Sequence, residues 1–365
     1  MITVSAPGRI CLFGEHQDYL GLPVIPMAIN LRVTIKCKPR KDRIFHLLLP
    51  DIGREIKLVF TDNKEFIYNN EINYFKSIYN VLYRQGVRFL QGYDCLVTSE
   101  IPINSGTSSS SALNNVWCRF LLETGENVPE SWKQPEAVGR FSYEAEVVEF
   151  SEAGGMMDQL STAVGNLAYI DFADDNRLEF LPARLGTFVL GDSQEPKDTQ
   201  KILSQTKIPA LSAAHKANFD YTQIDHKYLD EFKSALTQKE YTISRAMIKN
   251  RDITREAVKL LKADDIDHKK IGALFNEHQY ILDKYLGIST PKINRMLEAA
   301  NEAGAYGGKI NGSGGGGCMF AYAPEYPQKV AAAIEQAGGK AYIIKMDKGI
   351  TVKLRSIRNL AEVCD

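Results

Sequence analysis

The sequence of 365 residues lacks an excess of charge of either sign. Its 44 Lys and Arg residues almost balance 45 Asp and Glu residues, which leaves a formal net charge of -1. A protein that binds nucleic acid or an anionic membrane normally carries a broad positive field, and this balance leaves room only for a local basic patch. We therefore expect a small-molecule partner, with neither nucleic acid nor a membrane as partner.

Long apolar runs and clustered cysteines are also missing. No window approaches the ~18 uninterrupted apolar residues of a membrane span, and no basic segment followed by an apolar one opens the chain as a secretory signal would. The six cysteines are scattered, without a CxxC pair or a zinc-ligand cluster. These absences predict a reduced, cytoplasmic protein.

The length predicts two domains at roughly 150 residues per domain. Mixed strands and helices give way to long, charged helices near residues 180–190, so we predict domains over residues 1–185 and 186–365. Hydrophobic periodicity predicts strands at 2–4, 10–13, 28–38, 93–101, 167–172, 178–181, 187–190, 317–323, 340–346 and 350–354, and helices at 70–86, 108–124, 135–150, 271–285, from 291 onward and 327–337.

A serine-rich loop, Asn-Ser-Gly-Thr-Ser-Ser-Ser-Ser-Ala-Leu at residues 104–113, lies between a predicted strand and a predicted helix. A helix start preceded by small residues presents free backbone N–H groups to a phosphate. A helix cap is the alternative, but four consecutive serines exceed what capping needs. The loop lacks the Gly-Lys-Ser/Thr of a Walker A motif and the second glycine of a nucleophile elbow. It therefore predicts a phosphate-binding site of another kind.

A second loop concentrates 8 of the 27 glycines within residues 304–317. Such density permits close backbone approach to a ligand. Gly312, Gly314 and Gly317 satisfy GxGxxG, but a strand-like segment follows where the dinucleotide fingerprint needs a helix. The pattern argues against a Rossmann dehydrogenase, and the apolar segments on both sides argue against the alternative of a mobile linker.

Two short segments add carboxylates. Residues 14–19, Gly-Glu-His-Gln-Asp-Tyr, follow an apolar strand, and alone could be a solvated turn, because two possible metal ligands do not make a site. In residues 154–159, Gly-Gly-Met-Met-Asp-Gln, the acid follows two methionines. Asp158 is therefore either a base with a perturbed pKa or a helix cap.

In this order and spacing, the segments 6–28, 106–113, 155–159 and 305–318 resemble the GHMP small-molecule kinase superfamily and, within it, the galactokinase branch. Mevalonate kinases typically carry Lys where Arg9 stands and lack the acid at Asp18. The resemblance implies an α+β fold in two lobes, with an N-terminal lobe like ribosomal protein S5 domain 2, a ferredoxin-like C-terminal lobe and the active site between them.

The resemblance also implies an activity, which is ATP-dependent phosphorylation of the anomeric hydroxyl of galactose or a related monosaccharide, with Mg²⁺. The turn Leu20-Gly21-Leu22 departs from the galactokinase pattern, so the identity of the sugar stays open. Other GHMP kinases of the mevalonate or homoserine type, and a non-catalytic sugar sensor on the same fold, are the alternatives. A serine hydrolase is a remote one, since the nucleophile elbow is missing.

The family's functional residues carry over to four groups of positions. Glu146 is reached by counting back twelve residues from Asp158, with Glu144 and Glu149 as neighbours. His278 also fits a family pattern, but on an apolar helix face we expect a hydrogen-bonded core histidine, with a catalytic one as the alternative. The implied roles are Asp158 and Arg9 at the transfer centre; Glu15, His16, Asp18 and Gly155 on the sugar; Gly106, Thr107, Ser108, Ser109, Ser110 and Ser111 on the nucleotide; and Ser110 and Glu146 on magnesium.

Overall fold

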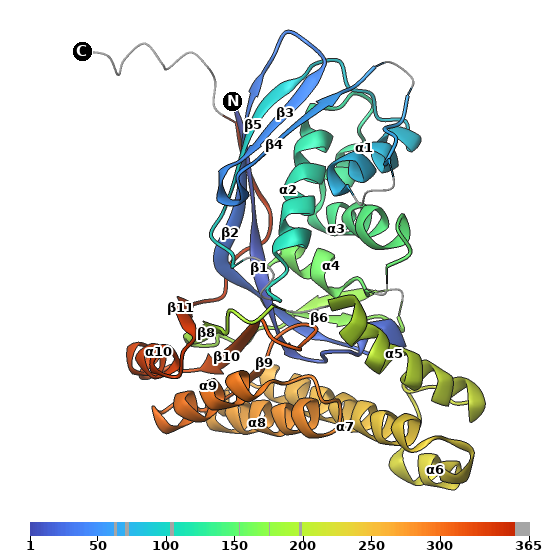
Figure 1. The fold of residues 1–365 in the computed structure, drawn as a ribbon, viewed down its shortest axis with the longest axis vertical. Coiled ribbons are helices and arrows are strands. Elements are labelled where there is room, and N and C mark those ends of the chain that lie inside the picture. The colour runs from blue at the N-terminus through green and yellow to red at the C-terminus, as the bar shows by residue number, and fades with distance from the viewer. Residues whose placement is uncertain are drawn as a thin grey trace.

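The computed structural model describes residues 1–61, 64–69, 73–102, 106–152, 154–174, 176–196 and 199–354. A six-stranded sheet in the order β12-β1-β2-β5-β3-β4 carries helices on one face (Figure 1). Its strands are β1 (Ile2–Phe13), β2 (Ile25–Pro39), β3 (Ile44–Leu49), β4 (Arg54–Val59), β5 (Tyr93–Ser99) and β12 (Thr351–Leu354). The covering helices are α1 (Tyr74–Arg84), α2 (Ser109–Thr124), α3 (Pro135–Tyr143) and α4 (Met157–Val164).

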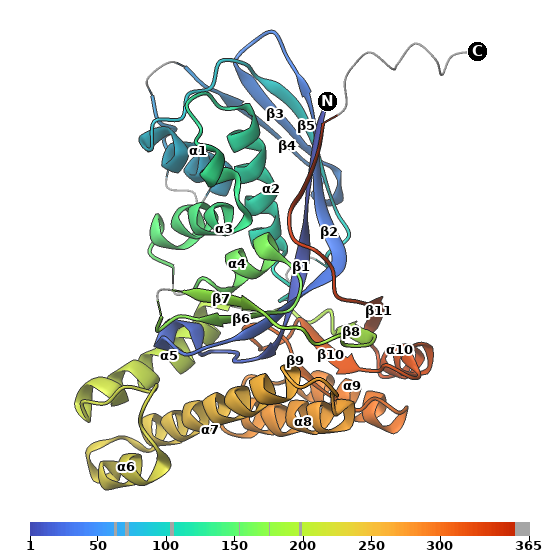
Figure 2. The ribbon, with the colours of Figure 1, turned by 180° about the vertical axis from the view of Figure 1, so that it is seen from behind.

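A smaller antiparallel sheet in the order β11-β8-β10-β9 packs against long helices, with α7 and α8 side by side (Figure 2). Its strands are β8 (Phe188–Asp192), β9 (Gly307–Ile310), β10 (Cys318–Tyr322) and β11 (Lys340–Ile344). The helices are α5 (Thr199–Lys216), α6 (His226–Glu231), α7 (Gln238–Leu261), α8 (His268–Lys284), α9 (Pro291–Glu302) and α10 (Pro327–Gln336). Helical crossovers join β8 to β9 and β10 to β11, which is the expected ferredoxin-like order.

Short elements complete the chain. Strands β6 (Ala168–Asp171) and β7 (Arg177–Phe180) form a hairpin of their own, and single helical turns lie at Asp18–Leu20, Pro50–Ile52, Glu130–Lys133 and Lys233–Ala235. A π-helical turn spans Glu144–Val148. In the part of the chain that the structure describes, no helix combines the length and hydrophobicity that a membrane crossing requires.

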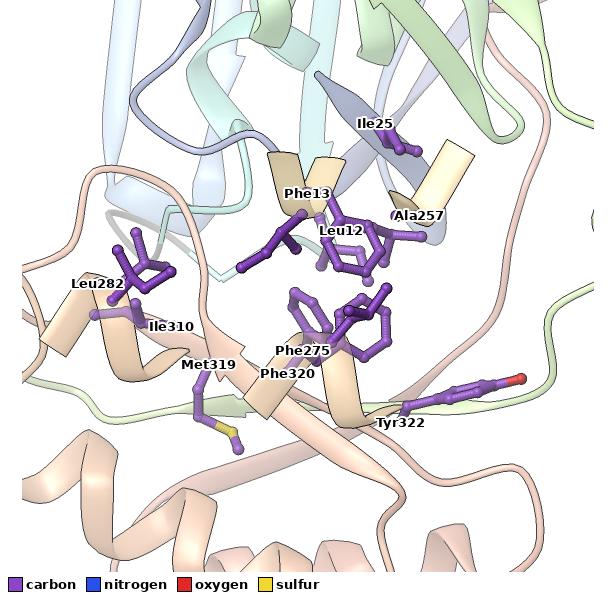
Figure 3. Packing of buried hydrophobic residues seen from close by; sticks show 14 of the residues in the cluster. Leu12, Phe13, Ile25, Ala257, Phe275, Leu282, Ile310, Met319, Phe320 and Tyr322 are labelled. Atoms are coloured by element: carbon purple, nitrogen blue, oxygen red, sulfur yellow. The ribbon is translucent and has the colours of Figure 1, made fainter. Parts of the chain in front are cut away.

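Strands β1 and β2 serve two hydrophobic cores. The first half of β1, with Val4 and Ala6, packs under α2, while Leu12 and Phe13 at its far end belong to the core of the smaller sheet. Figure 3 shows Leu12 and Phe13 facing Phe275 and Phe320, and the rings of Phe13 and Phe275 stack with centroids 4.8 Å apart. The register of β1 against β2 shifts between Pro7 and Gly8. A bulge thus lies where β1 passes from one core to the other.

The α+β class is confirmed, and several element predictions need correction. The predicted helix at 135–150 ends at Tyr143 and continues as the π-turn, and strands β3, β4 and β9 were not predicted. The first turn predicted for the helix at 70–86 falls partly outside the described residues, and α1 begins at Tyr74. The domain division at residue 185 stays a prediction; strand β12, from beyond that point, pairs with β1.

The predicted glycine loop at 304–317 is wrong in its first half, because Gly307–Ile310 form the fully buried strand β9. A Cβ added to Gly307 would lie 1.9 Å from the carbonyl oxygen of Gly272 in α8, so glycine lets helix and strand touch. The true loop is residues 311–317, where Gly312, Gly314 and the three glycines after it all have positive φ.

Candidate active site

A cavity of about 480 Å³ lies where β1, the starts of α2 and α4 and the loop 311–317 meet. The structure brings every predicted site residue except Thr107 to its wall, and the carbonyl oxygen of Thr107 accepts a hydrogen bond from the Arg9 backbone at 3.1 Å. The lining residues are Arg9, Glu15, His16, Asp18, Tyr74, Gly106, Ser108, Ser109, Ser110, Ser111, Glu146, Val147, Glu152, Gly154, Gly155, Met157, Asp158, Gln159, Gly312 and Ser313.

Arg9 and Asp158 form an ion pair at the centre of the cavity. The register shift between β1 and β2, with the extra residues Asn30 and Leu31 in β2, lies beside Gly8 and Arg9. Asp158 lies in the first turn of α4, where the helix dipole favours an anion. Arg9 Nη2 and Nε lie 2.6 and 3.0 Å from Asp158 Oδ1, and the Arg9 side chain is 3% exposed. Among the described residues, none donates to Asp158 Oδ2, and the side chain is 35% exposed, so this oxygen can receive a substrate hydroxyl.

The serine-rich loop opens α2 toward the same cavity. Ser108, the N-cap residue, has a φ of 59° and makes no side-chain cap hydrogen bond. Its buried hydroxyl has no partner among the described residues. The capping alternative therefore fails for Ser108, and the free N–H groups and hydroxyls at this helix start fit the oxygens of a phosphate.

Glu146 reaches the cavity from the π-turn. Its Oε2 accepts from Gln159 Nε2 at 2.8 Å and from Ser111 Oγ at 3.1 Å, and burial raises the pKa of its carboxyl. No Lys or Arg pairs with it in the described parts of the chain. A buried carboxylate beside the side chain of Ser110, an exposed residue, fits Mg²⁺, which prefers oxygen ligands and keeps several waters.

The two neighbouring acids do not share this position. Glu144 is absent from the cavity wall, and Glu149 pairs with Arg84, whose Nη2 lies 2.6 Å from Glu149 Oε2. The described residues hold no group of three His, Cys, Asp or Glu side chains that could bind a metal. A metal here would therefore depend on phosphate oxygens and water for most of its ligands.

Asp18 faces the Arg9–Asp158 pair from the turn Asp18–Leu20. Burial and the Asp158 carboxylate raise the pKa of Asp18 to about 6, against backbone N–H donors from Tyr19 and Met157 that lower it. A Cβ on Gly155 would lie 1.9 Å from Asp18 Oδ2. Gly155 therefore contributes the space that lets this carboxylate approach α4.

Glu15 and His16 also line the cavity, but their polar atoms have protein partners. Glu15 Oε1 accepts from the Gly312 N–H at 2.9 Å, and Oε2 pairs with Lys309. His16 Nδ1 lies 2.9 Å from Thr206 Oγ1, and Nε2 lies 3.0 Å from the carbonyl oxygen of Ser313. Because a carbonyl only accepts, Nε2 must carry a hydrogen. The sugar-binding role of both residues stays a prediction, and their observed partners join the loop 14–19 to the loop 311–317.

Tyr74 and Glu152 on the cavity wall, and Lys309, which pairs with Glu15, were not predicted from the sequence. Tyr74 Oη donates to Glu152 Oε1 at 3.0 Å across the cavity wall, and burial with the nearby Glu146 and Glu152 raises the pKa of Tyr74. Lys309 is fully buried in β9. In the sequence, Glu152 is marked only as an acid six residues before Asp158, and Lys309 only as a single lysine in an apolar segment.

His278 is buried as expected, and its expected hydrogen bond is wrong. The side chain is 0% exposed and stacks on Phe13 with centroids 6.1 Å apart. Neither ring nitrogen has a partner within the described residues. Burial, together with Lys309 and His16, lowers the pKa of His278 well below its usual value, so the ring stays neutral.

Three family models match the chain. They are the galactokinase galactose-binding signature at residues 2–39, the GHMP kinases N terminal domain at 73–166 and the GHMP kinases C terminal model at 257–341. They cover the strand of Arg9, the segment from α1 through α4 and most of the α8-to-β11 region. Each therefore falls on elements that build the cavity.

Proteins of similar sequence include both mevalonate kinases and galactokinases. A mevalonate kinase of Thermococcus sibiricus is 28% identical over 361 residues, covering 95% of this chain and 96% of the relative. A galactokinase of Glaesserella parasuis is 28% identical over 349 residues, covering 90% and 86%.

Solved structures show the same fold. The galactokinase of Lactococcus lactis complexed with galactose superposes with a TM-score of 0.80 at 22% identity, over 96% of this chain and 95% of that one. The Methanococcus jannaschii mevalonate kinase gives 0.73 at 20% identity, over 95% and 98%. With the family models on its cavity-forming elements, this chain belongs to the GHMP kinase superfamily.

Proposed function

We propose that the protein transfers the γ-phosphoryl group of ATP to a hydroxyl of a neutral sugar, with the anomeric hydroxyl of galactose or a close relative as the first candidate. The observation that carries this proposal is the charge of the cavity. Among its described lining residues, Arg9 is the only Lys or Arg, and Asp158 already pairs with it. The other carboxylates on the wall are Asp18, Glu146 and Glu152, and Glu15, whose charge is balanced by Lys309.

This balance favours a polyol over an anionic acceptor. Carboxylates accept hydrogen bonds from hydroxyls, and an acceptor with its own carboxylate would need a free Arg or Lys. The Lys309 ammonium is buried against Glu15 and offers none. The match to the galactose-binding signature and the similarity to a galactokinase complexed with galactose support the same choice.

The residues divide the transfer between them. The acceptor oxygen attacks the γ-phosphorus, the bond from that phosphorus to the bridging oxygen of ADP breaks, and the hydroxyl proton passes to Asp158 Oδ2 or to solvent. Arg9 stabilises charge on the transferring group, and the start of α2 holds the phosphates. Ser110 and Glu146 would hold Mg²⁺, which when bound supplies charge neutralisation at the β- and γ-phosphates.

Mevalonate phosphorylation is the second candidate, because a mevalonate kinase matches 95% of the chain at 28% identity. The two candidates differ in the charge of the acceptor. A galactokinase-type enzyme should ignore an anionic substrate, and a mevalonate-type enzyme should require one.

The test is ADP release with Mg²⁺ and ATP across a panel of hexoses, pentoses, uronic acids, mevalonate and homoserine. We expect turnover with a neutral sugar, and Asp158→Asn should lose at least about 10²-fold in kcat with it. Turnover of mevalonate alone would select the second candidate. Absence of ADP release for the whole panel would leave the sensor alternative.

A further inference from the structure

A buried ion pair that the proposed chemistry does not use joins the two loops of the site. Lys309 lies in β9 and is 0% exposed, and Glu15, in the loop after β1, is 1% exposed. Lys309 Nζ donates to Glu15 Oε2 and, at 3.0 Å, to the carbonyl oxygen of Ile310. The ring of Phe320 lies 5.0 Å from the same ammonium. Each charge therefore has the other as its partner, away from water.

Such a pair is sensitive to the loss of either member. Removing one partner leaves an uncompensated charge in an apolar setting, whereas replacing both by neutral groups is often tolerated. Burial raises the pKa of Glu15, and the Lys309 ammonium acts in the opposite direction by stabilising the carboxylate. The second oxygen of Glu15 can then accept from Gly312, at the start of the glycine loop.

A chain of contacts leads from this pair to the transfer centre. Asn311, between Lys309 and Gly312, accepts from the Cys11 N–H at 2.8 Å and donates from Nδ2 to the Gly106 carbonyl oxygen at 2.8 Å. The same oxygen receives Arg9 Nη1 at 2.5 Å.

The contact between Gly312 and Gly106 of the phosphate loop is tight. A Cβ on Gly312 would lie 2.7 Å from the Gly106 oxygen, so residues 311–312 rest directly on the phosphate loop. A displacement of these two residues would therefore move both Gly106 and the guanidinium of Arg9.

We propose that Lys309 is a positioning residue for phosphoryl transfer. Through Glu15 it fixes residues 311–312 against Gly106, and this contact holds the Arg9 guanidinium in line with Asp158 and the phosphate loop. Glu15 then acts through this tether and not as a ligand of the sugar. The inference rests on the proposed function, because it concerns the same reaction centre.

The test is a double-mutant cycle of Glu15→Gln, Lys309→Met and the double variant, with kcat, the acceptor KM and thermal unfolding measured for each. We expect Lys309→Met to lower kcat about tenfold or more and to change the acceptor KM less than about threefold. Adding Glu15→Gln to Lys309→Met should cost no further kcat and should recover stability, because the double variant buries no unpaired charge.

A matched pair on the surface is the control. Lys262 Nζ lies 2.7 Å from Glu179 Oε1, and both side chains are about two-fifths exposed at 41% and 43%. The cycle of Glu179→Gln and Lys262→Met should leave kcat unchanged and show little coupling in stability.

Three results would overturn the proposal. The first is a Glu15→Gln variant that raises the acceptor KM tenfold or so, with the same factor in both backgrounds, since a direct sugar contact behaves additively. The second is a Lys309→Met variant that unfolds at lower temperature but keeps wild-type kcat where it is folded. The third is unchanged amide hydrogen exchange over residues 311–318 in Lys309→Met, a readout that needs no acceptor and so separates this proposal from the proposed function.

Discussion

Asp18 and Asp158 face one cavity from different surroundings. Asp158 has a guanidinium within hydrogen-bond distance, whereas Asp18 has only backbone N–H donors and a second carboxylate beside it. Burial and that neighbour raise the pKa of Asp18 to about 6. We therefore expect Asp18 to be the carboxyl of this cavity whose titration is seen near pH 6.

The titration of Asp18 predicts the pH dependence of acceptor use. As an ionised acceptor for sugar hydroxyls, Asp18 functions above its pKa and loses this ability when it is protonated, so kcat/KM for the acceptor should fall as the pH drops through about 6. Initial rates at saturating MgATP between pH 5 and 8 measure this. Asp18→Asn should be weaker throughout and should lack the acid limb, and a variant that kept the limb would assign it to another group.

Gly155 offers a steric test of the same carboxylate. A methyl group there would overlap Asp18 Oδ2, so Gly155→Ala must push Asp18 out of the position that it holds. We expect kcat/KM for the acceptor to fall about tenfold or more, the cost of a lost hydrogen bond to a charged group, with little change in the KM for ATP. Gly154→Ala is the matched control, because a Cβ there meets only Val147 at 3.7 Å. Equal losses for both alanines would contradict this account.

At the scale of elements, two local irregularities aim side chains into the cavity. The β-bulge of β2 opposite Gly8 lies where β1 changes cores, and the π-turn Glu144–Val148 widens the end of the helix that begins as α3. The extra residue in such a turn rotates the positions that follow, so Glu146 and Glu149 point to different surroundings. Glu146 meets Gln159 and Ser111, and Glu149 meets Arg84.

This division within one turn predicts different effects of the same substitution. Glu146→Gln removes the charge expected to hold Mg²⁺, so the Mg²⁺ concentration for half-maximal rate should rise about tenfold or more while the sugar KM changes little. Glu149→Gln should leave the Mg²⁺ dependence unchanged, because this carboxylate lies with Arg84. Magnesium titrations of both variants decide the point, and the reverse order would move the metal site along the turn.

At the scale of the whole molecule, the chain returns to its starting sheet. After the smaller sheet is complete, residues 345–354 run back along β2 and pair with β1 as β12. Arg32 of β2 holds this return segment, with Nη1 2.5 Å from Asp347 Oδ2 and Nη2 2.8 Å from the Gly349 carbonyl oxygen. The segment after β11 therefore connects the smaller sheet to the six-stranded sheet, where β12 pairs with the first strand of the chain.

Removing the hydrogen bonds from Arg32 to the return segment should lower the stability of the whole protein, and none of these residues lines the cavity. Arg32→Ala removes hydrogen bonds made by a charged group that is largely buried, at 15% exposed, so we expect the free energy of unfolding to fall by about 2 to 4 kcal/mol. Denaturant unfolding measures this, with Arg177→Ala as the control, since Arg177 is 58% exposed and its ion pairs should contribute under about 1 kcal/mol. Equal losses of unfolding free energy for the two variants would mean that the hydrogen bonds of Arg32 stabilise the fold no more than an exposed ion pair does.

The amino-acid sequence by itself determined the local parts of the site. The serine-rich and glycine-rich loops, the acid after the paired glycines and the alternation of apolar residues in β2 are patterns within a few residues, and such patterns constrain the backbone directly. The α+β class followed from the resemblance of these segments to the GHMP kinases. Strand β9 is short and contains two glycines, so it lacks such an alternation and was missed. Strands β3 and β4 were missed as well, although Ile56 and Leu58 of β4 alternate with charged residues.

Only the tertiary structure decided which of these parts work together. Arg9 and Asp158 stand 149 positions apart, and Glu15 and Lys309 stand 294 apart, so neither pairing follows from a local pattern. Burial decides the rest. Helix α8 packs against both β9 and β1, where Lys309 and His278 are buried. Burial also raises the pKa of Asp18 and of Glu146, and Glu146 lies between Ser111 of α2 and Gln159 of α4. Desolvation depends on every element around a group, and no segment of sequence carries that information alone.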